Sequence, residues 1–438
     1  MASFDMTRKP SKVAAAARAH DAKSFLSAKE AAHLLRIKPQ TLYAYVSRGW
    51  IHSIGQDKRH GFLYSREDVE RLRARGHAKA EGGLYKGGAP RWSEPIVQTS
   101  ITTITPAGPA YRGRPALDFV RHSQSFESVA ELLWSGAWME EQGAWPGTAA
   151  AVAMDKLIAA AEVDASQPDI VKLFSLFVMS LVARPSGGDD LRDGNTVIAA
   201  RALLMGLPAC MRFLARSRKS IALDASASGG GLAVAARIVA GAGARATAET
   251  TAAVNTALVL LADHELTPQT VAARLAASSG ANLYFCILSA LSAHSGSRIR
   301  RACDKVEDLL TTARARSTRR DRLAEMAKSG SAIPGFNHPL YPNGDPRAEH
   351  LLGVARNLSI NPDRTIDIVT FLEEAAEAFK IGPSVETGLV VLCHALQLPY
   401  RSAGAILTIA RCAGWIAHVM EQRLAGVMLR PRARYLVN

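Results

Sequence analysis

Alanine-rich segments with a helical spacing of apolar residues run through most of this chain, and they constrain its fold more than any other feature. Ser128–Trp134 and Thr250–Leu261 are two examples, and few runs of β-branched residues interrupt such segments. Alanine is the best helix former, and a 3.6-residue apolar period is typical of helices that bury one face. The sequence therefore predicts a mainly α protein with small β additions.

The chain is too long for one compact core. It has 438 residues, so we expect two or three domains. The charge supports such a division, because the first 90 residues hold 17 Lys and Arg against 8 Asp and Glu, a net +9 of the +14 carried by the whole chain. A small basic module of this kind attracts a phosphate backbone, and a solvated basic surface is the alternative.

Other features bear on the cellular location. No stretch approaches the roughly 20 uncharged apolar residues needed to span a bilayer, and Met1–Asp5 lacks the apolar block of a signal peptide. The five cysteines form no CxxC pair, so we expect reduced and mostly buried thiols. The prediction is a cytoplasmic protein with no membrane partner.

The basic N-terminal part carries the signals of a small folded module. Residues 1–24 are polar with little periodicity, which predicts a flexible arm. Ser27 and Glu30 then form a capping box before a first helix. Pro39 begins a second helix that buries Leu42. The chain from residue 25 onward is therefore expected to be ordered.

A wing and a further helix complete this module. Two short strands, Ile51–Ile54 and Phe62–Tyr64, are expected around a polar turn, and Ser65–Asp68 caps the next helix. This succession over residues 25–75 resembles the winged helix-turn-helix of the excisionase and mercury-regulator class. The resemblance implies that the second helix enters the major groove of DNA and that the wing touches the backbone. It assigns base contacts to Gln40, Thr41 and Arg48, and phosphate contacts to Lys58 and Arg59. The alternative to DNA binding is that this module docks on the same chain or on a protein partner.

A linker is predicted at residues 76–95, which are rich in Gly, Ala and Lys and have no apolar period. The rest of the chain carries a series of polar motifs in a fixed order. They are Tyr111–Pro115, Phe126–Leu133, Ala262–Leu266, Gly335–His338, Asp345–Arg347, Arg411 ahead of Gly414–His418, and Arg430–Arg432. In this order they resemble a citrate synthase. The resemblance, over residues 96–438, implies a two-lobed helical domain that forms a homodimer, with a large lobe at about 96–297 and 395–438 and a small lobe at about 298–394.

The chemistry of such enzymes explains the residue types. Condensing an acyl-CoA with a 2-oxo acid requires a carboxylate base, donors for the enol and for the ketone, and cations for the carboxylates. The resemblance implies that His264 hydrogen-bonds the oxo acid and that His338 polarises its ketone. The carboxylates, of oxaloacetate, citrate or a similar di- or tricarboxylate, would be held by three arginines: Arg347, Arg411 and Arg430, the last supplied by the partner subunit.

The acyl-CoA side departs from the family pattern. The enol-stabilising histidine of the family falls on Ile299, which has no donor, and the two following glycines fall on Arg300 and Arg301. The catalytic aspartate falls on Glu386, which keeps the carboxylate but adds a methylene, and Asn337 replaces a glycine. Losing a donor to a developing enolate costs roughly a hundred- to a thousandfold in rate. We therefore expect condensation with Glu386 as base to be weak or lost.

Several alternatives stay open at this point. His294, five residues before Ile299, is another candidate donor if the loop is rebuilt. No metal is implied, because His264-Glu265 lacks the second histidine of a HExxH helix, and acetyl-CoA or CoA would be a substrate rather than a bound cofactor. The chain is then an acyltransferase, a carboxylate-sensing DNA-binding regulator, or a non-catalytic subunit in a heteromer with an active paralogue.

Overall fold

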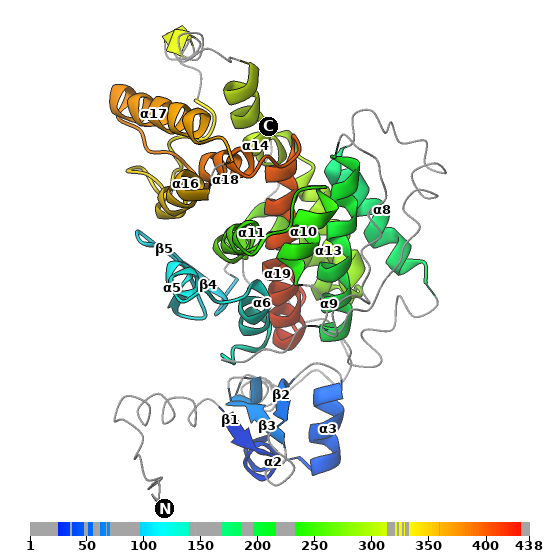
Figure 1. Cartoon of the computed structure of the whole chain (residues 1–438). Coiled ribbons are helices and arrows are strands. Elements are labelled where there is room, and N and C mark those ends of the chain that lie inside the picture. The colour runs from blue at the N-terminus through cyan, green and yellow to red at the C-terminus, as the bar shows by residue number, and fades with distance from the viewer. Residues whose placement is uncertain are drawn as a thin grey trace, which may run out of the picture.

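The computed structural model of the chain is mainly helical (Figure 1). It describes residues 25–35, 37–47, 51–55, 62–66, 68–70, 97–139, 145, 169–184, 196–215, 233–312, 320–321, 324–325, 328, 333–358 and 360–430. The expected fold class, a helical protein with small β additions, is confirmed. The expected arm, the whole of the expected linker and residues 431–438 lie outside the described residues.

The N-terminal module has the expected order of elements and one additional strand. Its elements are β1 (Phe25–Ser27), α2 (Ala28–Leu35), α3 (Pro39–Ser47), β2 (Ser53–Gly55) and β3 (Phe62–Ser65). The capping box is present, since Ser27 N donates to Glu30 Oε2 (2.8 Å) and Glu30 N donates to Ser27 Oγ (3.3 Å). The two wing strands pair antiparallel, but β1 also pairs with β3, so the sheet order is β1-β3-β2. Leu42 of α3 is fully buried in this module's own core.

The larger part of the chain begins with a three-stranded sheet and continues almost wholly in helices. The sheet has the order β4-β5-β6, from β4 (Thr102–Thr105), β5 (Gly108–Tyr111) and β6 (Arg114–Pro115). The helices up to the middle of the chain are α5 (Ala116–Arg121), α6 (Phe126–Ser135), α8 (Ile170–Val182), α9 (Thr196–Gly206), η2 (Leu207–Phe213), α10 (Val234–Gly241), α11 (Ala248–Leu261), α12 (Pro268–Ser278) and α13 (Leu283–His294). Those that follow are α14 (Ser297–Thr312), α16 (Pro346–Leu358), α17 (Pro362–Phe379), α18 (Val385–Ala395) and α19 (Ser402–Ala425).

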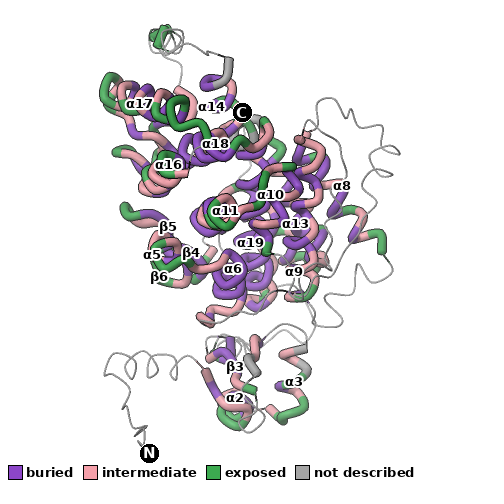
Figure 2. The backbone as a smooth tube through the Cα atoms, in the orientation of Figure 1, coloured by how far each residue is buried: buried purple, intermediate pink, exposed green. Residues whose placement is uncertain are grey.

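Helix α19 is the centre of the packing. It contacts α6, α11, α12, α13 and α14, and nearly all of its residues are buried (Figure 2). Trp134 of α6 donates from Nε1 to the carbonyl oxygen of Ala413 (3.0 Å). Gly414 allows the closest approach, because a Cβ there would lie 2.1 Å from Asp263 Oδ1. A side chain larger than hydrogen is therefore excluded where α19 passes the end of α11.

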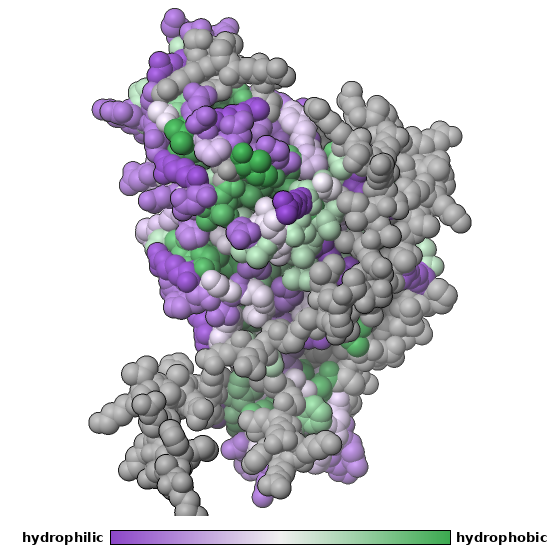
Figure 3. Space-filling view, in the orientation of Figure 1, coloured by the Kyte–Doolittle hydropathy of each residue, from purple (hydrophilic) through white to green (hydrophobic). Residues whose placement is uncertain are grey.

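Helices α14, α16, α17 and α18 form a second packed set, called here the upper helix group, at the top of Figure 1. Its outer turns are hydrophilic, whereas hydrophobic residues gather where it meets the helices below (Figure 3). Arg401 connects it to the start of α19: its backbone N donates to Glu307 Oε2 (2.9 Å), and its guanidinium pairs with Asp304 and Asp308. The upper helix group is thus held to α19 at a charged junction.

Two described segments are long and apolar enough to cross a membrane on length and composition alone, Thr196–Phe213 and Ser402–Ala425. The expectation that no stretch approaches this composition is therefore wrong. The most apolar window of Ser402–Ala425 is 89% buried inside the protein, as is common for a core helix, and that of Thr196–Phe213 is 50% buried. Their composition is weak evidence for a membrane.

Candidate carboxylate site

His264 lies in the turn between α11 and α12. Within this turn, Glu265 has a left-handed backbone (φ 60°), and its N donates to Asp263 Oδ2 (3.0 Å). Helix α19 closes the other side, where Gly414 N donates to the carbonyl oxygen of Ala262 (3.0 Å). The two helices and α19 together fix the position of His264.

His338 lies in the loop before α16, and this loop is joined to the segment that begins α18. Thr387 Oγ1 donates to the carbonyl oxygen of Gly335 (2.6 Å), and Asn337 N donates to that of Gly382 (3.0 Å). Asn337 has a φ of 57°, a left-handed conformation that asparagine tolerates better than most residues. The replacement of a glycine by Asn337 is therefore compatible with the loop geometry.

These two segments and α16 bring several predicted residues together. The ring centroids of His264 and His338 are 5.5 Å apart, and the planes are inclined by 71°. Tyr341 lies 6.5 Å from the first ring and 5.5 Å from the second, and the guanidinium carbon of Arg347 is 5.5 Å from the Tyr341 ring. Tyr341 was not expected at this place, and its only sequence signal is a position three residues after His338.

Two arginines, Arg347 fully buried and Arg411 partly buried, carry the positive charge of the cluster. Arg347 is held by Asp345 through Nε to Oδ1 (3.0 Å) and Nη2 to Oδ2 (2.7 Å). Burial lowers the pKa of Arg347, but the attraction of Asp345 outweighs it, so the pKa is raised above its ordinary value. Arg411, from α19, has its pKa lowered by burial, against the opposing attraction of Asp263. Arg347 is therefore already paired with a carboxylate of the protein, that of Asp345.

Both imidazoles are neutral at physiological pH. Burial, followed by the charges of Arg347 and Arg411, holds the pKa of His264 well below its usual range. Burial also lowers the pKa of His338, although the carboxylate of Glu386 pulls it upward. Neutral rings can donate or accept hydrogen bonds without adding charge to a site that already holds two arginines.

Four polar atoms of this cluster are buried and have no hydrogen-bond partner among the described residues. They are His264 Nδ1, Tyr341 Oη, Arg347 Nη1 and Arg411 Nη1. For His338, Leu340 N donates to Nδ1 (3.2 Å), which leaves the proton on Nε2. Cationic and neutral donors thus converge, and a di- or tricarboxylate has both the charge and the acceptor oxygens to satisfy them.

The expected base lies beside this cluster. Glu386 is in the first turn of α18, and Ser384 Oγ donates to its Oε2 (2.6 Å). Its charge acts on the pKa of His338, so the two side chains are electrostatic neighbours. Ile299 is in the first turn of α14, one turn before buried Cys303, whose pKa is raised by burial and then by Glu386. Ile299 is therefore on a helix that packs against α18, which carries Glu386.

Arg301 and His294 are two described residues close to Ile299 in the sequence that carry side-chain donors. The side chains of Ile299 and Arg300 lie outside the described part, and Arg301 is exposed. Both ring nitrogens of His294 already have partners, Gln269 Nε2 at 3.3 Å from Nδ1 and Thr408 Oγ1 at 3.1 Å from Nε2. The alternative that His294 serves as donor would require these two core hydrogen bonds to break.

A buried polar chain behind His264 was missed by sequence reasoning. Arg274 Nη1 donates to His418 Nδ1 (3.0 Å), which places the remaining proton of His418 on Nε2, 3.4 Å from Asp263 Oδ2. Arg274 also pairs with Glu421 (2.6 Å), whose other oxygen accepts from Ser100 N (2.9 Å). Burial raises the pKa of Asp263, but His418 outweighs it and the pKa is lowered. Asp263, next to His264, is thus kept ionised and fixed.

The remaining predicted residues are not part of this cluster. Arg430 is exposed and follows the end of α19. On α3, Gln40 is exposed and Thr41 is half-buried, while Tyr43 is 53% exposed and was not predicted as a contact. The other expected DNA contacts, Arg48, Lys58 and Arg59, lie outside the described residues. Among the described residues, no group of three or more His, Cys, Asp or Glu is placed to hold a metal ion.

The fold and this arrangement of helices are those of the citrate synthases. A ternary complex of carboxymethyl coenzyme A and oxaloacetate with citrate synthase from Thermoplasma acidophilum superposes with a TM-score of 0.62 at 22% identity, covering 78% of this chain and 94% of that chain. Citrate synthase from Thermotoga maritima MSB8 gives 0.59 at 22% identity, covering 81% and 96%. These likenesses establish the fold.

The chain belongs to the citrate synthase family, since the family model "Citrate synthase, C-terminal domain" matches residues 91–432. A second model, "Helix-turn-helix domain", matches residues 25–77, which confirms the resemblance of the N-terminal module. The curated relatives include Citrate synthase 2 of Bacillus subtilis (strain 168), 29% identical over 186 residues, which are 42% of this chain and 50% of the relative. The 2-methylcitrate synthase of Mycobacterium tuberculosis (strain ATCC 25618 / H37Rv) is 27% identical over 354 residues, 77% of this chain and 87% of the relative. The chain thus spans about half the length of several curated relatives that it matches.

Proposed function

We propose that this chain binds oxaloacetate, citrate or a similar carboxylate between His264, His338, Arg347 and Arg411. The observation that carries the proposal is the set of unpartnered buried donors and cations around two neutral imidazoles. Citrate synthase of Thermoplasma acidophilum holds oxaloacetate in its ternary complex, which is consistent with this ligand class. Arg430 is proposed to complete the site from a partner subunit.

The proposed reaction is the condensation of an acyl-CoA with that oxo acid. Glu386 takes a proton from the carbon next to the thioester, His338 Nε2 donates to the ketone oxygen, and a carbon–carbon bond forms between the two carbons. Water then hydrolyses the thioester and releases CoA. Because Ile299 offers no donor to the enol oxygen, turnover is expected to be about a hundredfold or more slower than with a donor in place.

Comparing the natural chain with one variant tests carboxylate binding and the condensation reaction separately. Calorimetry on the purified full-length chain should detect oxaloacetate and citrate, and CoA release from acetyl-CoA should be slow. The variant Ile299→His with Arg300→Gly and Arg301→Gly should bind citrate as the natural chain does but release CoA about a hundredfold faster. Equal turnover by both proteins would refute the proposal that Ile299 slows the reaction. If neither carboxylate binds, the proposed carboxylate site is refuted.

The helix-turn-helix domain favours a second candidate function, a DNA-binding regulator that senses the carboxylate. Gln40 and Tyr43 are exposed on α3, the helix that enters the major groove in this class of domain. The basic charge of the first 90 residues suits a phosphate backbone. Carboxylate binding would then alter the placement of the DNA-binding modules rather than start a reaction.

A mobility-shift titration of the full chain on genomic fragments tests this second function. Binding should weaken steeply with salt, and Thr41→Ala should relax sequence preference without changing the salt dependence. If the two sites are coupled, saturating citrate changes the DNA affinity, and DNA changes the citrate affinity by the same factor. No binding at low salt would remove the DNA function, and binding that ignores citrate would remove the sensor.

The proposal includes a cytoplasmic homodimer. Large apolar side chains are exposed on α8, α9 and α13, namely Met179, Ile198 and Phe285. Exposed apolar residues of this kind mark a subunit interface when they form one surface. Light scattering after size exclusion should give twice the chain mass, and Phe285→Glu should shift it toward the monomer. We also propose that residues 25–75 and 96–438 are separate domains.

A further inference from the structure

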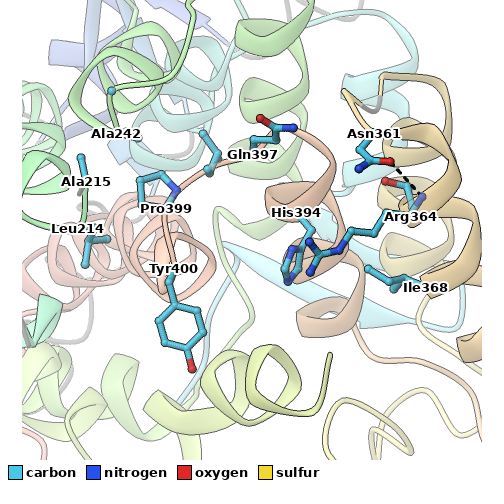
Figure 4. Close-up of a pocket in the computed structure, with 13 residues that line it drawn as sticks. Leu214, Ala215, Ala242, Asn361, Arg364, Ile368, His394, Gln397, Pro399 and Tyr400 are labelled. Atoms are coloured by element: carbon cyan, nitrogen blue, oxygen red, sulfur yellow. Dashed lines mark hydrogen bonds between the residues drawn. The ribbon is translucent and has the colours of Figure 1, made fainter. Parts of the chain in front are cut away.

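A cavity of about 550 Å3 lies away from the carboxylate cluster, between the upper helix group and the helices below it (Figure 4). One wall is the first turns of α17, and another is the end of α18 with the segment that leads to α19. The opposite wall comes from the residues that follow η2 and α10. Its size lies within the range of small-molecule sites, about 300 to 1,000 Å3. None of the residues proposed above for carboxylate or acyl-CoA chemistry lines it.

The polar side of the cavity is positive. Arg364, in the first turn of α17, has an exposed side chain, and its backbone N donates to the side chain of Asn361 (3.3 Å), which caps the helix. The N-terminus of α17 adds partial positive charge at the same place, while its Arg364 N and Thr365 N are already bonded to Asn361. Among the described residues that line the cavity there is no Asp or Glu. An anionic group would therefore meet attraction on this side.

His394 gives a second and independent sign of a ligand. It lines the cavity close to Arg364, and its Nε2 is buried without a hydrogen-bond partner among the described residues. Burial, and then the charge of Arg364, lowers its pKa to about 4, so the ring is neutral at physiological pH. An anion placed between the two side chains would accept from both and raise the pKa of His394.

Much of the rest of the cavity is apolar, with Thr365 and Gln397 as polar exceptions. Leu214, Ile368 and Leu398 line it, and Tyr400, a residue that is 47% exposed, lines it as well. A bare inorganic ion would leave these surfaces in contact with water, whereas a ligand with an apolar or aromatic body would cover them. The lining therefore suits an anion that also carries a hydrocarbon or ring portion.

We propose that this cavity is a second ligand site, which binds a small organic anion through Arg364, His394 and the N-terminus of α17. The anionic group is a carboxylate or a phosphate monoester, and an apolar or aromatic body fills the space beside Leu398 and Tyr400. Because its walls come from the upper helix group and from the ends of η2 and α10, a bound molecule holds these parts together. The site goes beyond the proposed function and does not depend on it.

Titration of the full-length chain with three probes tests the proposal. Adenosine 5′-monophosphate offers a phosphate on an aromatic body, benzoate offers a carboxylate, and adenosine is the neutral control. At least one of the two anions should bind with one site per chain, and adenosine should bind at least about tenfold more weakly. Whichever anion binds identifies the anionic group.

Variants locate the binding. Arg364→Ala should weaken binding of the anion at least about tenfold. Arg356 is an exposed arginine of α16 paired with Glu373, and Arg356→Ala should leave the affinity unchanged. Arg347→Lys should also leave it unchanged, which separates this cavity from the carboxylate cluster. The NMR titration of His394, assigned with His394→Gln, should move to higher pH when the anion binds. Failure of both anions to bind at 10 mM (about 3 kcal/mol), or equal affinity of the natural chain and Arg364→Ala, would overturn the proposal.

Discussion

Replacing Arg274 with methionine should destabilise the protein far more than replacing an arginine at the surface. Arg274 is 2% exposed, and its partner Glu421 is buried as well. Removing the guanidinium leaves a buried carboxylate without its counter-charge, which costs about 3 to 5 kcal/mol. The lowered pKa of Glu421 corresponds to a free energy of similar size. Burial raises it, but Arg274 and Ser100 outweigh burial and hold it at about 2 rather than 4.5, a difference that corresponds to about 3 kcal/mol.

The same pair predicts a pH dependence. Because the pKa of Glu421 is lower in the folded protein than in the unfolded chain, its contribution to stability is present above about pH 4.5 and is lost as the pH falls toward 2. In Arg274→Met the pKa of Glu421 rises, so this contribution is missing at every pH. The difference in unfolding free energy between the natural chain and the variant should therefore be largest above pH 5 and shrink in acid.

Urea unfolding followed by circular dichroism at pH 7 and pH 4 measures both effects. The matched control is Arg356→Met, which breaks the exposed pair with Glu373 and should cost less than about 1 kcal/mol. Combining Arg274→Met with Glu421→Leu should recover most of the loss, because no unpaired charge remains. A loss in Arg274→Met no larger than in the control would show that the buried pair is not what fixes this region.

Three further predictions concern the carboxylate cluster. Arg347→Lys and Arg411→Lys should each weaken citrate binding by about 1.5 to 3 kcal/mol in calorimetry, since lysine cannot reproduce a bidentate guanidinium, and unchanged affinity in both would mean that the site does not bind citrate. Gly335→Ala should lower the free energy of unfolding by about 1 to 3 kcal/mol, because Gly335 has a φ of 78° and a Cβ would lie 2.1 Å from Thr387 Oγ1; a denaturation midpoint like that of the natural chain would contradict the loop geometry. His264 has a folded pKa below its ordinary 6.5, so its contribution to stability is present above about pH 6.5 and falls by up to about 1.4 kcal/mol per pH unit below it. His264→Gln should flatten the stability curve between pH 6.5 and 5, and an unaltered slope would count against a buried neutral ring.

Local sequence signals predicted the parts of the fold that depend on neighbours in the chain. The box of Ser27 and Glu30 needs only a spacing of three residues, and it forms as expected. The approach of His264, His338 and Arg347 was implied by family resemblance, because no local rule brings together side chains some 70 to 80 residues apart. The site roles themselves stay predictions.

Long-range polar pairing could not be foreseen. Arg274 looks like an ordinary helix arginine in the sequence, yet its partners His418 and Glu421 are 144 and 147 residues away. The sequence likewise gave no indication that Tyr341 packs beside the rings of His264 and His338. Strand β1 was missed because three residues carry too short an alternation to distinguish a strand from an extended lead into a helix. In each case the deciding contact comes from tertiary packing.

Helix α19 carries Arg411, Gly414, His418 and Glu421 at spacings of three, four and three residues, so all four fall on successive turns of one face. The rotation of this one helix about its axis therefore positions residues of both the carboxylate cluster and the buried polar chain that contains Arg274. Inserting one residue between Arg411 and Gly414 would turn the two halves of the face by about 100° relative to each other. A point substitution in this helix therefore changes one position at a time, whereas a single-codon insertion would displace residues of both the carboxylate cluster and the buried chain. Length changes should be absent from this stretch in any collection of functional variants.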